Sequence, residues 1–377
     1  MKKQKIVISG ANITSGGPLT IFNDTLKQVS EIDSVQVIAI VSDKQFFHTS
    51  HNIHFIEIPY YKKIILLKFF FEYVYYYFLS KKIKPTVWIS LNDFTPNVIT
   101  KKLYTYFHNA SLFFSPKPAD YIFSLRSIFQ KFYYNYFFGF FLHQNTALIV
   151  QQNWLGENIH KKYHLPVDQI IIFRPHATYS VEPELQNKKK VDLKKKKKII
   201  LFYPTTAYSY KNIEAIGDAL KIISEKGLCD KVEIRLTISG NETLYAKYVK
   251  HRYKNLPITW LGKLTRAEVE NEYLNASALI FPSRLESWGL PLSEFTKYKK
   301  PIIAIDLGYA KETLRDYPFT LFFNPEDINQ LSKIIIDMIE DKAINFSKTT
   351  DHNYKTFRNV NSWAELLPKK TPKMILI

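Results

Sequence analysis

Short apolar runs alternate with helix-forming segments along both halves of the chain, and this alternation limits the possible folds more than any other feature. The runs that we interpret as buried strands lie at 5–9, 35–41, 54–58, 86–90, 103–107, 147–151 and 169–173 in the first half, and at 199–203, 232–239, 258–261, 278–281, 302–305 and 320–323 in the second. Strands that alternate with helices indicate α/β architecture with parallel sheets. A chain of 377 residues is long for one hydrophobic core, so the pattern predicts two α/β domains.

Two helix starts agree with this pattern. Residues 265–268, Thr-Arg-Ala-Glu, have the sequence of a capping box, in which the first and last side chains bond to each other's backbone N–H groups. At 324–327, Asn-Pro-Glu-Asp offers Asn324 as a cap, a proline at the first helical position and early acids. Both motifs predict a helix that begins just after a strand.

The segment FPSRLESWGLPLSE, residues 281–294, carries the strongest indication of chemistry. A strand ends at its first residue, a helix begins near Pro291, and Glu286 and Glu294 stand eight residues apart. Free backbone N–H groups at a helix start attract anions, phosphate above all. A carboxylate at Glu294 can accept two hydrogen bonds from a vicinal diol such as ribose, and Glu286 can contact a second polyol beyond the phosphates. Together these features suit a nucleotide sugar, although two solvated acids flanking a helix would give the same pattern.

Six segments between 199 and 323 resemble, in order, the donor domain of retaining glycosyltransferases of family 4, which have the GT-B fold. They are FYPTTAYSYKN ending in Lys211 and Asn212, IRLTISGNE with Gly240, ITWLGKL with Gly262, ALIFPS, the paired glutamates, and KPIIAIDLGYAKETL with Gly308 and Glu312. The order and spacing of the whole set make the resemblance specific, whereas the first half of the chain matches more loosely.

The resemblance implies a GT-B fold of class α/β, with two Rossmann-like domains whose parallel sheets face each other across a cleft. Residues 1–184 would form an N-terminal acceptor domain, 185–198 a lysine-rich linker, and 199–345 the nucleotide-sugar donor domain. Residues 346–377, which include Trp363, resemble the family's tail, which crosses back to pack on the first domain.

Lys211 is the candidate cation for the donor phosphates, because it lies just past the first strand of the second domain, before an expected helix at 212–225. An exposed lysine near a helix start is the alternative, which the helix dipole slightly disfavours. Many family members place an arginine six residues before this lysine, but this sequence has Thr205 there. The two-cation clamp is therefore incomplete, and backbone N–H groups or another cation would have to replace the arginine.

The first domain offers a glycine pair and a histidine. Gly16 and Gly17 lie after the first strand and open a helix, where glycine lets the backbone approach a ligand closely; a plain turn is the alternative. His108 directly follows a strand, at the sheet edge where open α/β sheets bind ligands. A lone histidine is more often structural, but in family 4 a histidine at this place faces the transferred sugar. Asn109 and Asp93 lie at strand ends and are possible acceptor contacts.

The resemblance implies transfer of a sugar from a nucleotide-diphosphate sugar to a hydroxyl, with retention of anomeric configuration by same-face attack. Lys211 and the amides of 287–290 would stabilise charge on the departing phosphate, while Glu286 orients sugar hydroxyls. No Asp-x-Asp triplet occurs in the sequence, so we expect neither a metal ion nor another cofactor. We expect catalytic roles for His108, Lys211 and Glu286, and donor contacts from Gly16, Gly17, Lys211, Glu286, Ser287, Trp288, Gly289, Leu290 and Glu294.

Abundant Lys, Ile, Tyr, Phe and Asn are typical of AT-rich bacterial coding, and family members of this type commonly build surface polysaccharide. We therefore expect a glycan or lipid-linked glycan acceptor in O-antigen, lipooligosaccharide or capsule synthesis. Two alternatives stay open. One is a catalytically weak or non-catalytic nucleotide-sugar-binding protein, which Thr205 favours; the other is a nucleotide-sugar epimerase, which needs no acceptor.

The formal net charge of +18 raises the question of an anionic partner. Residues 188–198 concentrate eight lysines and one aspartate, and a solvated linker or attraction to anionic lipid headgroups would each account for them. No RNA-binding signature or zinc-finger spacing accompanies the run, so we expect no nucleic-acid partner.

The compartment follows from the single cysteine and from the start of the chain. Cys229 alone excludes an intrachain disulfide and fits a reducing compartment, and the first apolar run is too short for a signal peptide. We expect a cytoplasmic protein, with peripheral attachment to the inner face of the plasma membrane as an open alternative.

Two aromatic stretches, 64–79 and 121–142, bear on that alternative. Neither predicts a transmembrane helix, because charged or polar residues such as Lys68 and Glu72 interrupt them. They fit either core-packed helices or a surface in the membrane interface, where tyrosine is favoured. For the second interpretation, the candidate face is 73–78.

Overall fold

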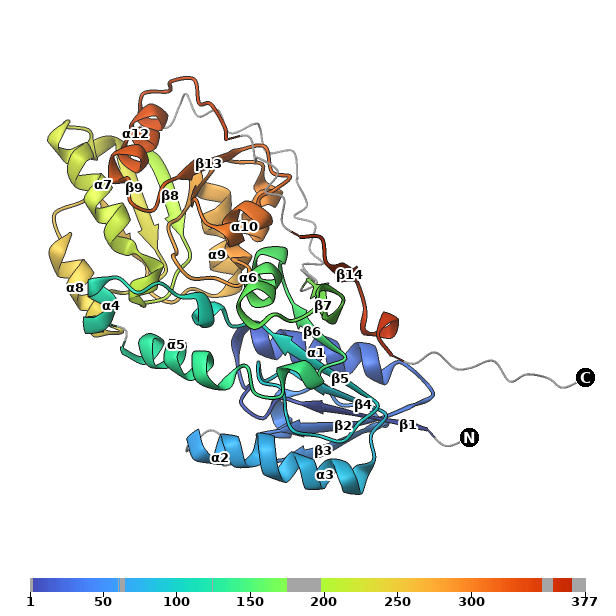
Figure 1. The fold of residues 1–377 in the computed structure, drawn as a ribbon. Helices are drawn as coiled ribbons and strands as arrows, with labels where there is room; N and C mark the ends of the chain where they lie inside the picture. The colour runs from blue at the N-terminus through green and yellow to red at the C-terminus, as the bar shows by residue number, and fades with distance from the viewer. Residues whose placement is uncertain are drawn as a thin grey trace, which may run out of the picture. The chain divides into compact units, whose positions relative to one another are not determined.

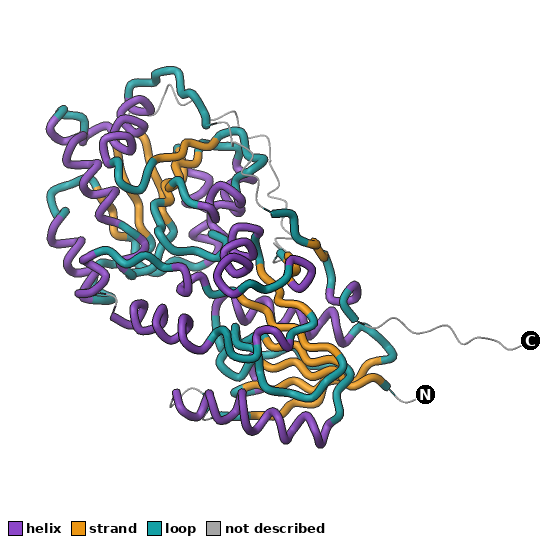
Figure 2. The backbone as a smooth tube through the Cα atoms, viewed as in Figure 1, coloured by secondary structure: helices purple, strands orange, loops and turns teal. Residues whose placement is uncertain are grey.

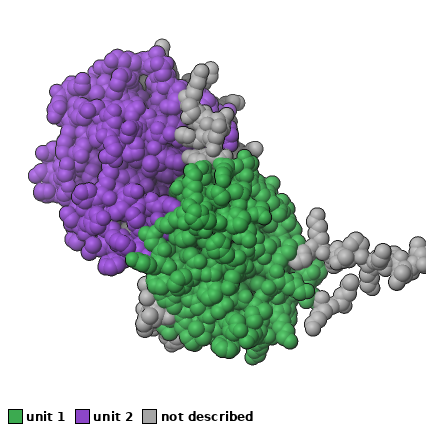
Figure 3. Space-filling model, viewed as in Figure 1, with its two compact units in different colours: residues 1–109, 133–177, 354–377 green, residues 110–132, 178–353 purple. Residues whose placement is uncertain are grey.

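The computed structural model describes residues 3–59, 61, 65–123, 125–174, 198–347 and 355–367. Contacts divide the chain into two compact units, coloured in Figure 3. Unit 1 comprises residues 1–109, 133–177 and 354–377, and unit 2 comprises 110–132 and 178–353. This division differs from the expected domains because residues 110–132 group with the second half of the chain, and because its other boundaries fall after 177 and 353, where 184 and 345 were expected. The predicted linker 185–198 lies outside the described residues except for Lys198.

Unit 1 is built on a sheet of parallel strands in the order β14-β7-β6-β5-β4-β1-β2-β3, labelled in Figure 1. The strands are β1 (Gln4–Ser9), β2 (Val35–Val41), β3 (Ile53–Glu57), β4 (Val87–Ser90), β5 (Lys102–Phe107), β6 (Ala147–Val150), β7 (Ile170–Phe173) and β14 (Arg358–Val360). The connecting helices are α1 (Gly16–Ser30), α2 (Ile65–Phe69), the π-helix η2 (Phe70–Tyr75), α3 (Tyr76–Ile83) and α6 (Asn153–Tyr163), and α5 (Leu125–Phe137) runs across the division between the units.

Unit 2 contains a second parallel sheet, in the order β10-β9-β8-β11-β12-β13. Its strands are β8 (Ile199–Tyr203), β9 (Val232–Leu236), β10 (Ile258–Trp260), β11 (Ala278–Phe281), β12 (Ile302–Ile305) and β13 (Thr320–Phe323). Its helices are α4 (Pro118–Phe123), α7 (Ile213–Glu225), α8 (Leu244–Arg252), α9 (Arg266–Asn275), α10 (Leu290–Phe295), α11 (Gly308–Thr313) and α12 (Ile328–Ile339). Helices and strands alternate along the backbone drawn in Figure 2, and the predicted α/β class with two parallel sheets is confirmed.

In both sheets the strand order reverses beside the first strand of the unit. The reversal falls between β1 and β4 in unit 1, and between β8 and β11 in unit 2. Ligands of open parallel sheets bind outside the carboxyl ends of the strands at such a reversal, because the flanking loops there diverge and leave a crevice. The topology therefore predicts that a ligand would bind at the loops after β1, β4, β8 and β11.

The strand bounds were predicted well where apolar runs end abruptly. The expected ranges of β8, β11, β12 and β13 match the structure, but the expected strand 232–239 is three residues too long. β9 ends at Leu236, because the next residues turn away from the ladder into a loop held by Glu242, whose side chain accepts hydrogen bonds from the backbone N–H groups of Ser239 and Gly240.

The two predicted helix starts had different outcomes. The capping box at Thr265 and Glu268 is present at the start of α9, with both reciprocal hydrogen bonds. For α12 the cap is Asp327, not Asn324, because the Asp327 side chain accepts the Gln330 N–H at 2.9 Å. Asn324 instead forms a local turn, in which its side chain accepts the N–H of Glu326.

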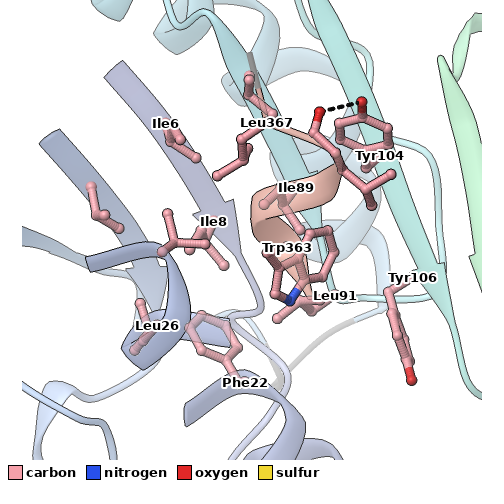
Figure 4. Packing of buried hydrophobic residues seen from close by; sticks show 14 of the residues in the cluster. Ile6, Ile8, Phe22, Leu26, Ile89, Leu91, Tyr104, Tyr106, Trp363 and Leu367 are labelled. Atoms are coloured by element: carbon pink, nitrogen blue, oxygen red, sulfur yellow. Dashed lines mark hydrogen bonds between the residues drawn. The ribbon is translucent and has the colours of Figure 1, made fainter. Parts of the chain in front are cut away.

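The end of the chain completes the core of unit 1, as Figure 4 shows. Trp363 is 1% exposed and packs in one cluster with Phe22, Leu26 and residues of the central strands. Its indole N–H donates to Thr25 Oγ1 at 2.9 Å, and the Tyr104 hydroxyl donates to the Leu366 carbonyl at 2.9 Å. Beside it β14 pairs in parallel with β7, so residues 358–367 of the tail belong to this sheet and its core. Ser347, also assigned to the tail, instead donates its backbone N–H to the Thr320 carbonyl of unit 2 at 2.8 Å.

The first aromatic stretch forms the continuous helical segment α2-η2-α3, with two unlike faces. Glu72 and Tyr76 are buried, whereas Phe70, Val74 and Phe78 are 48%, 43% and 62% exposed. The face expected at 73–78 is thus correct in part: Val74 and Phe78 are exposed, whereas Tyr76 points inward. Among the described residues, no helix is long and apolar enough to span a membrane.

Candidate functional site

In unit 2, the loops after β8 and β11 meet at the reversal of strand order. Lys211 ends a 3-10 turn, Ser209–Lys211, just before α7, and Glu286 lies between β11 and α10. The Lys211 ammonium and the Glu286 carboxylate form an ion pair, with 14% and 18% of the two side chains exposed. The structure therefore brings together two residues that the sequence analysis assigned to one site.

Hydrogen bonds between these loops fix their geometry. The backbone N–H of Arg284 donates to the Tyr210 carbonyl at 2.8 Å. The Asn212 side chain donates to the Pro282 carbonyl at 3.2 Å. Each bond joins a residue beside Lys211 to a residue of the loop that carries Glu286, so the separation of the two charges depends on both loops together.

The loop between Glu286 and Glu294 requires glycine at position 289. Gly289 has φ +79°, and a Cβ there would lie 3.1 Å from Leu292 and 3.3 Å from Tyr309. The indole of Trp288 donates to the Ser293 hydroxyl at 2.8 Å and so turns back onto α10. The neighbouring loop residues are half-buried, namely Ser287, Trp288 and Leu290.

Glu294 is 7% exposed within α10, and both of its carboxylate oxygens have protein partners. Arg266 approaches Oε1 at 2.9 Å, and the Tyr273 hydroxyl donates to Oε2 at 2.9 Å. Contact with a ribose diol would have to use the remaining acceptor positions of this carboxylate or displace Arg266, whose side chain is 47% exposed.

A groove of about 390 Å³ runs along the carboxyl ends of β8, β9 and β10. Thr205, which stands where the resemblance to family 4 leads us to expect arginine, lies in its wall and is held by Thr237. The Thr205 N–H donates to Thr237 Oγ1 at 2.7 Å, and that hydroxyl donates to the Thr205 carbonyl at 2.8 Å. The groove also contains a cation that sequence reasoning missed, Lys263. Its lining consists of Thr205, Thr206, Ala207, Tyr208, Thr237, Ile238, Glu242, Thr243, Lys263, Leu264 and Val269. Lys263 lies three residues after β10, and this place just after a strand was a signal available in the sequence.

In unit 1, the glycine pair lies at the other reversal of strand order, after β1. Gly16 begins α1 with φ +71°, a conformation that favours glycine. A Cβ added to Gly17 would meet no atom within 4 Å. The backbone conformation therefore explains the first glycine, whereas no packing within the described residues requires the second.

His108 is held by a buried carboxylate from the next strand end. Asp93, with 4% of its side chain exposed and φ +68°, lies 3.2 Å from His108 Nδ1 and accepts the His108 backbone N–H at 2.9 Å. The Tyr134 hydroxyl donates to the second Asp93 oxygen at 2.7 Å and accepts from the Asn109 amide at 2.9 Å. Because Nδ1 faces the carboxylate, Nε2 is the ring nitrogen available to a ligand.

A second buried acid lies beside this cluster. Glu72 accepts hydrogen bonds from the Tyr61 hydroxyl and from the Asn92 amide, the latter at 2.6 Å. Burial raises the pKa of Glu72 to about 7, although those hydrogen bonds and the charge of Lys68 lower it. Burial also lowers the pKa of Lys68, whose ammonium lies 4.5 Å above the ring of Phe94.

Among the described residues, no group of three or more His, Cys, Asp or Glu side chains could hold a metal ion.

The chain is similar in sequence to known glycosyltransferases. Residues 184–356 match the family model described as "Glycosyl transferases group 1". An uncharacterized glycosyltransferase of Methanocaldococcus jannaschii is 26% identical over 59% of this chain and 64% of its own length. A serotype-specific mannosyltransferase of Escherichia coli, WbdA, is 27% identical over 38% of this chain, which covers 18% of that protein. The chain thus spans less than two thirds of these curated relatives.

Solved structures extend the similarity over both units. Sucrose-phosphate synthase from Thermosynechococcus elongatus has a TM-score of 0.60 at 16% identity and covers 90% of each chain. Anabaena HepE, solved in complex with UDP, has a TM-score of 0.54 at 14% identity and also covers 90% of each chain. The protein has the GT-B fold predicted from its sequence. The family model over residues 184–356 and the M. jannaschii relative support the group 1 glycosyltransferase superfamily.

Proposed function

We propose that the protein is a retaining glycosyltransferase of family 4, which moves a sugar from a nucleotide-diphosphate sugar to a hydroxyl of a glycan or lipid-linked glycan. The observation that carries the proposal is the Lys211–Glu286 ion pair, placed at the strand reversal of the unit that matches the group 1 family model. HepE in complex with UDP supports a nucleotide donor, and the serotype-specific mannosyltransferase WbdA supports transfer of a sugar in bacteria.

Each part of the site has a role in this proposal. The departing nucleoside diphosphate develops negative charge, which Lys211 and the amides of 287–290 stabilise without a metal ion. Glu286, already paired with Lys211, orients sugar hydroxyls. Glu294 holds the ribose diol, and Gly16 and Gly17 let the backbone approach the donor phosphates.

His108 acts on the transferred sugar in this proposal. Asp93 fixes its ring, and Nε2 contacts a sugar hydroxyl. The position of His108 after β5, one strand from the reversal of order in unit 1, supports this role. The proton of the attacking acceptor hydroxyl passes to the departing phosphate on the same face of the sugar.

A panel of nucleotide-diphosphate sugars tests the function. The donor should raise the melting temperature, because it binds only the folded state, and nucleoside diphosphate should be released when a glycan acceptor is added. Release without a divalent metal ion, in the presence of a chelator, is expected. A thermal shift with no nucleotide release would instead indicate a binding protein, and conversion of the sugar without an acceptor would indicate an epimerase.

We also propose that unit 1 attaches to an anionic membrane from the cytoplasmic side, through an aromatic stripe formed by Phe70, Val74 and Phe78. These three apolar side chains face water on one helical segment, which is costly unless they meet an apolar partner. Lys81 and Lys82 follow at the end of the same segment and are exposed, so cations that attract anionic headgroups lie next to groups that insert into the interface.

Vesicle binding tests this attachment. The protein should bind phosphatidylglycerol vesicles better than phosphatidylcholine vesicles, with partial release as salt rises. A double variant, Phe70→Ser with Phe78→Ser, should weaken the salt-resistant part by roughly tenfold or more. The control is Phe46→Ser, which changes a phenylalanine of similar exposure, 43%, outside the stripe. Equal binding by the double variant and the control would overturn the proposal.

A further inference from the structure

A segment from the first half of the chain packs within unit 2, against the loops that carry Lys211 and Glu286. We call residues 110–123 the arm; it ends in helix α4. The ring of Phe123 stacks on Tyr248 at a centroid distance of 4.9 Å, and the ring of Phe114 meets Tyr210 edge-on at 6.2 Å. These contacts anchor the arm at two places.

Asp120 is the arm's buried charge. Its side chain is fully buried, and Arg284, with 8% of its side chain exposed, places Nη2 at 2.8 Å from both carboxylate oxygens. The Ser209 hydroxyl donates to Oδ1 at 2.5 Å, and the backbone N–H of Lys117 donates to Oδ2 at 2.6 Å. A buried carboxylate with this many partners is held in one position.

The partners of Asp120 lie beside the proposed catalytic residues. Ser209 precedes Lys211 by two residues, and Arg284 precedes Glu286 by two residues. Arg284 also donates to the Ser115 carbonyl of the arm at 3.3 Å, while its backbone N–H bonds to Tyr210. One carboxylate of the arm therefore bridges the loop after β8 and the loop after β11.

We propose that Asp120 and Arg284 are positioning residues for the transferase site: they set the distance between Lys211 and Glu286. The proposal rests on the proposed function. Asp120 touches neither of the two candidate side chains, so its effect passes through the loop backbones. Misplacement of a catalytic group by about 1 Å is enough to reduce turnover by roughly 10²-fold.

The test compares Asp120→Asn with Lys117→Ala. Asparagine keeps the size of the side chain and removes its charge. Lys117→Ala is the matched control in the same arm, because the Lys117 side chain makes an exposed ion pair with Glu326 at 3.0 Å and only its backbone contacts Asp120. Asp120→Asn should lower kcat by roughly tenfold or more, with a smaller change in donor KM, whereas the control should keep wild-type kcat.

A double-mutant cycle separates positioning from general stability. In a Lys211→Ala background, Asp120→Asn should have little further effect on kcat, because the charge that it positions is already gone. If Asp120→Asn does not fold, Ser209→Ala removes one bond to the same carboxylate and should lower kcat by about two- to threefold.

Three outcomes are distinct. Wild-type kcat in folded Asp120→Asn, or full additivity in the cycle, would overturn the positioning role and leave the proposed function intact. An inactive wild-type protein that binds neither UDP nor GDP would instead overturn the proposed function. Low kcat together with a non-additive cycle supports both.

Discussion

Two buried aspartates support the candidate site residues of the two units, and they do so in different ways. Asp93 in unit 1 contacts His108 directly and comes from the end of the neighbouring strand. Asp120 in unit 2 contacts the loops around Lys211 and Glu286, and it lies 164 residues before its partner Arg284. Asp93, close in sequence to His108, orients that one side chain. Asp120, far in sequence from Arg284, sets the spacing between Lys211 and Glu286. Loss of Asp93 should therefore affect one group, and loss of Asp120 should affect the relation between two.

The largest effect is expected from Lys211→Ala. Because Lys211 stabilises charge that develops on the departing phosphate, its removal should lower kcat by about 10²–10³-fold and raise donor KM much less. Steady-state kinetics with the donor identified by thermal shift would measure both constants. Full kcat in this variant would show that another cation, such as Lys263 in the adjacent groove, carries the role.

The second largest effect is expected from Asp93→Asn, which tests the direct contact between Asp93 and His108. Asparagine tolerates the left-handed backbone at this position, so the fold should survive, but the charged partner of the His108 ring is lost. We expect kcat to fall by roughly tenfold. Tyr134→Phe, which removes only one bond to the same carboxylate, serves as the milder control. A larger loss of kcat in Tyr134→Phe than in Asp93→Asn would contradict the proposal that Asp93 is the group that orients His108.

Glu294→Gln should act on binding rather than on turnover. Loss of a charge-assisted hydrogen bond to the ribose diol should raise donor KM by about tenfold. Tyr273→Phe removes the protein hydrogen bond to the same carboxylate without changing its charge, and should leave KM near the wild-type value. An unchanged KM in Glu294→Gln would contradict the proposed contact between this carboxylate and the ribose diol.

Glu72→Gln should leave turnover nearly unchanged and alter stability with pH. The pKa of Glu72 is about 7 in the folded protein against 4.5 for the unperturbed group. Between these values the folded state keeps a proton that the unfolded state releases, so stability falls as pH rises from 4.5 to 7. The variant lacks this titration and should be more stable than wild type by about 3 kcal/mol at pH 8, with no difference below pH 4.5. Chemical denaturation at several pH values measures this, and a constant difference across pH would exclude the raised pKa.

The sequence predicted those features that depend on local chemistry. The apolar runs that became β8 and β11 were located to the residue, and the capping box at Thr265 followed from its own four residues. The pairing of Lys211 with Glu286 could be predicted, because a parallel sheet brings the carboxyl ends of adjacent strands together. The groove cation Lys263 shares the same signal and was overlooked.

Features that depend on distant partners were not predicted. Nothing near Asp120 in the sequence distinguishes it from a solvated helix-start acid, because its partner Arg284 comes from the other half of the chain. The exposed stripe was predicted only in part. The expected face 73–78 includes Val74 and Phe78, but the burial of Tyr76 depends on its packing against distant residues of the sheet, which the local sequence does not give.

The packing of Trp363 into the core of unit 1 has a consequence for how the chain can be divided. Unit 1 needs β14 and Trp363 from the end of the chain, and unit 2 needs the arm from its first third. A cut anywhere in 185–198 would therefore separate each unit from a segment of its own core or site. During synthesis, the last strand of the first sheet leaves the ribosome only after every strand of the second. The two units are interleaved along the sequence although each is compact in space, so neither half of a chain divided at 185–198 contains a complete unit.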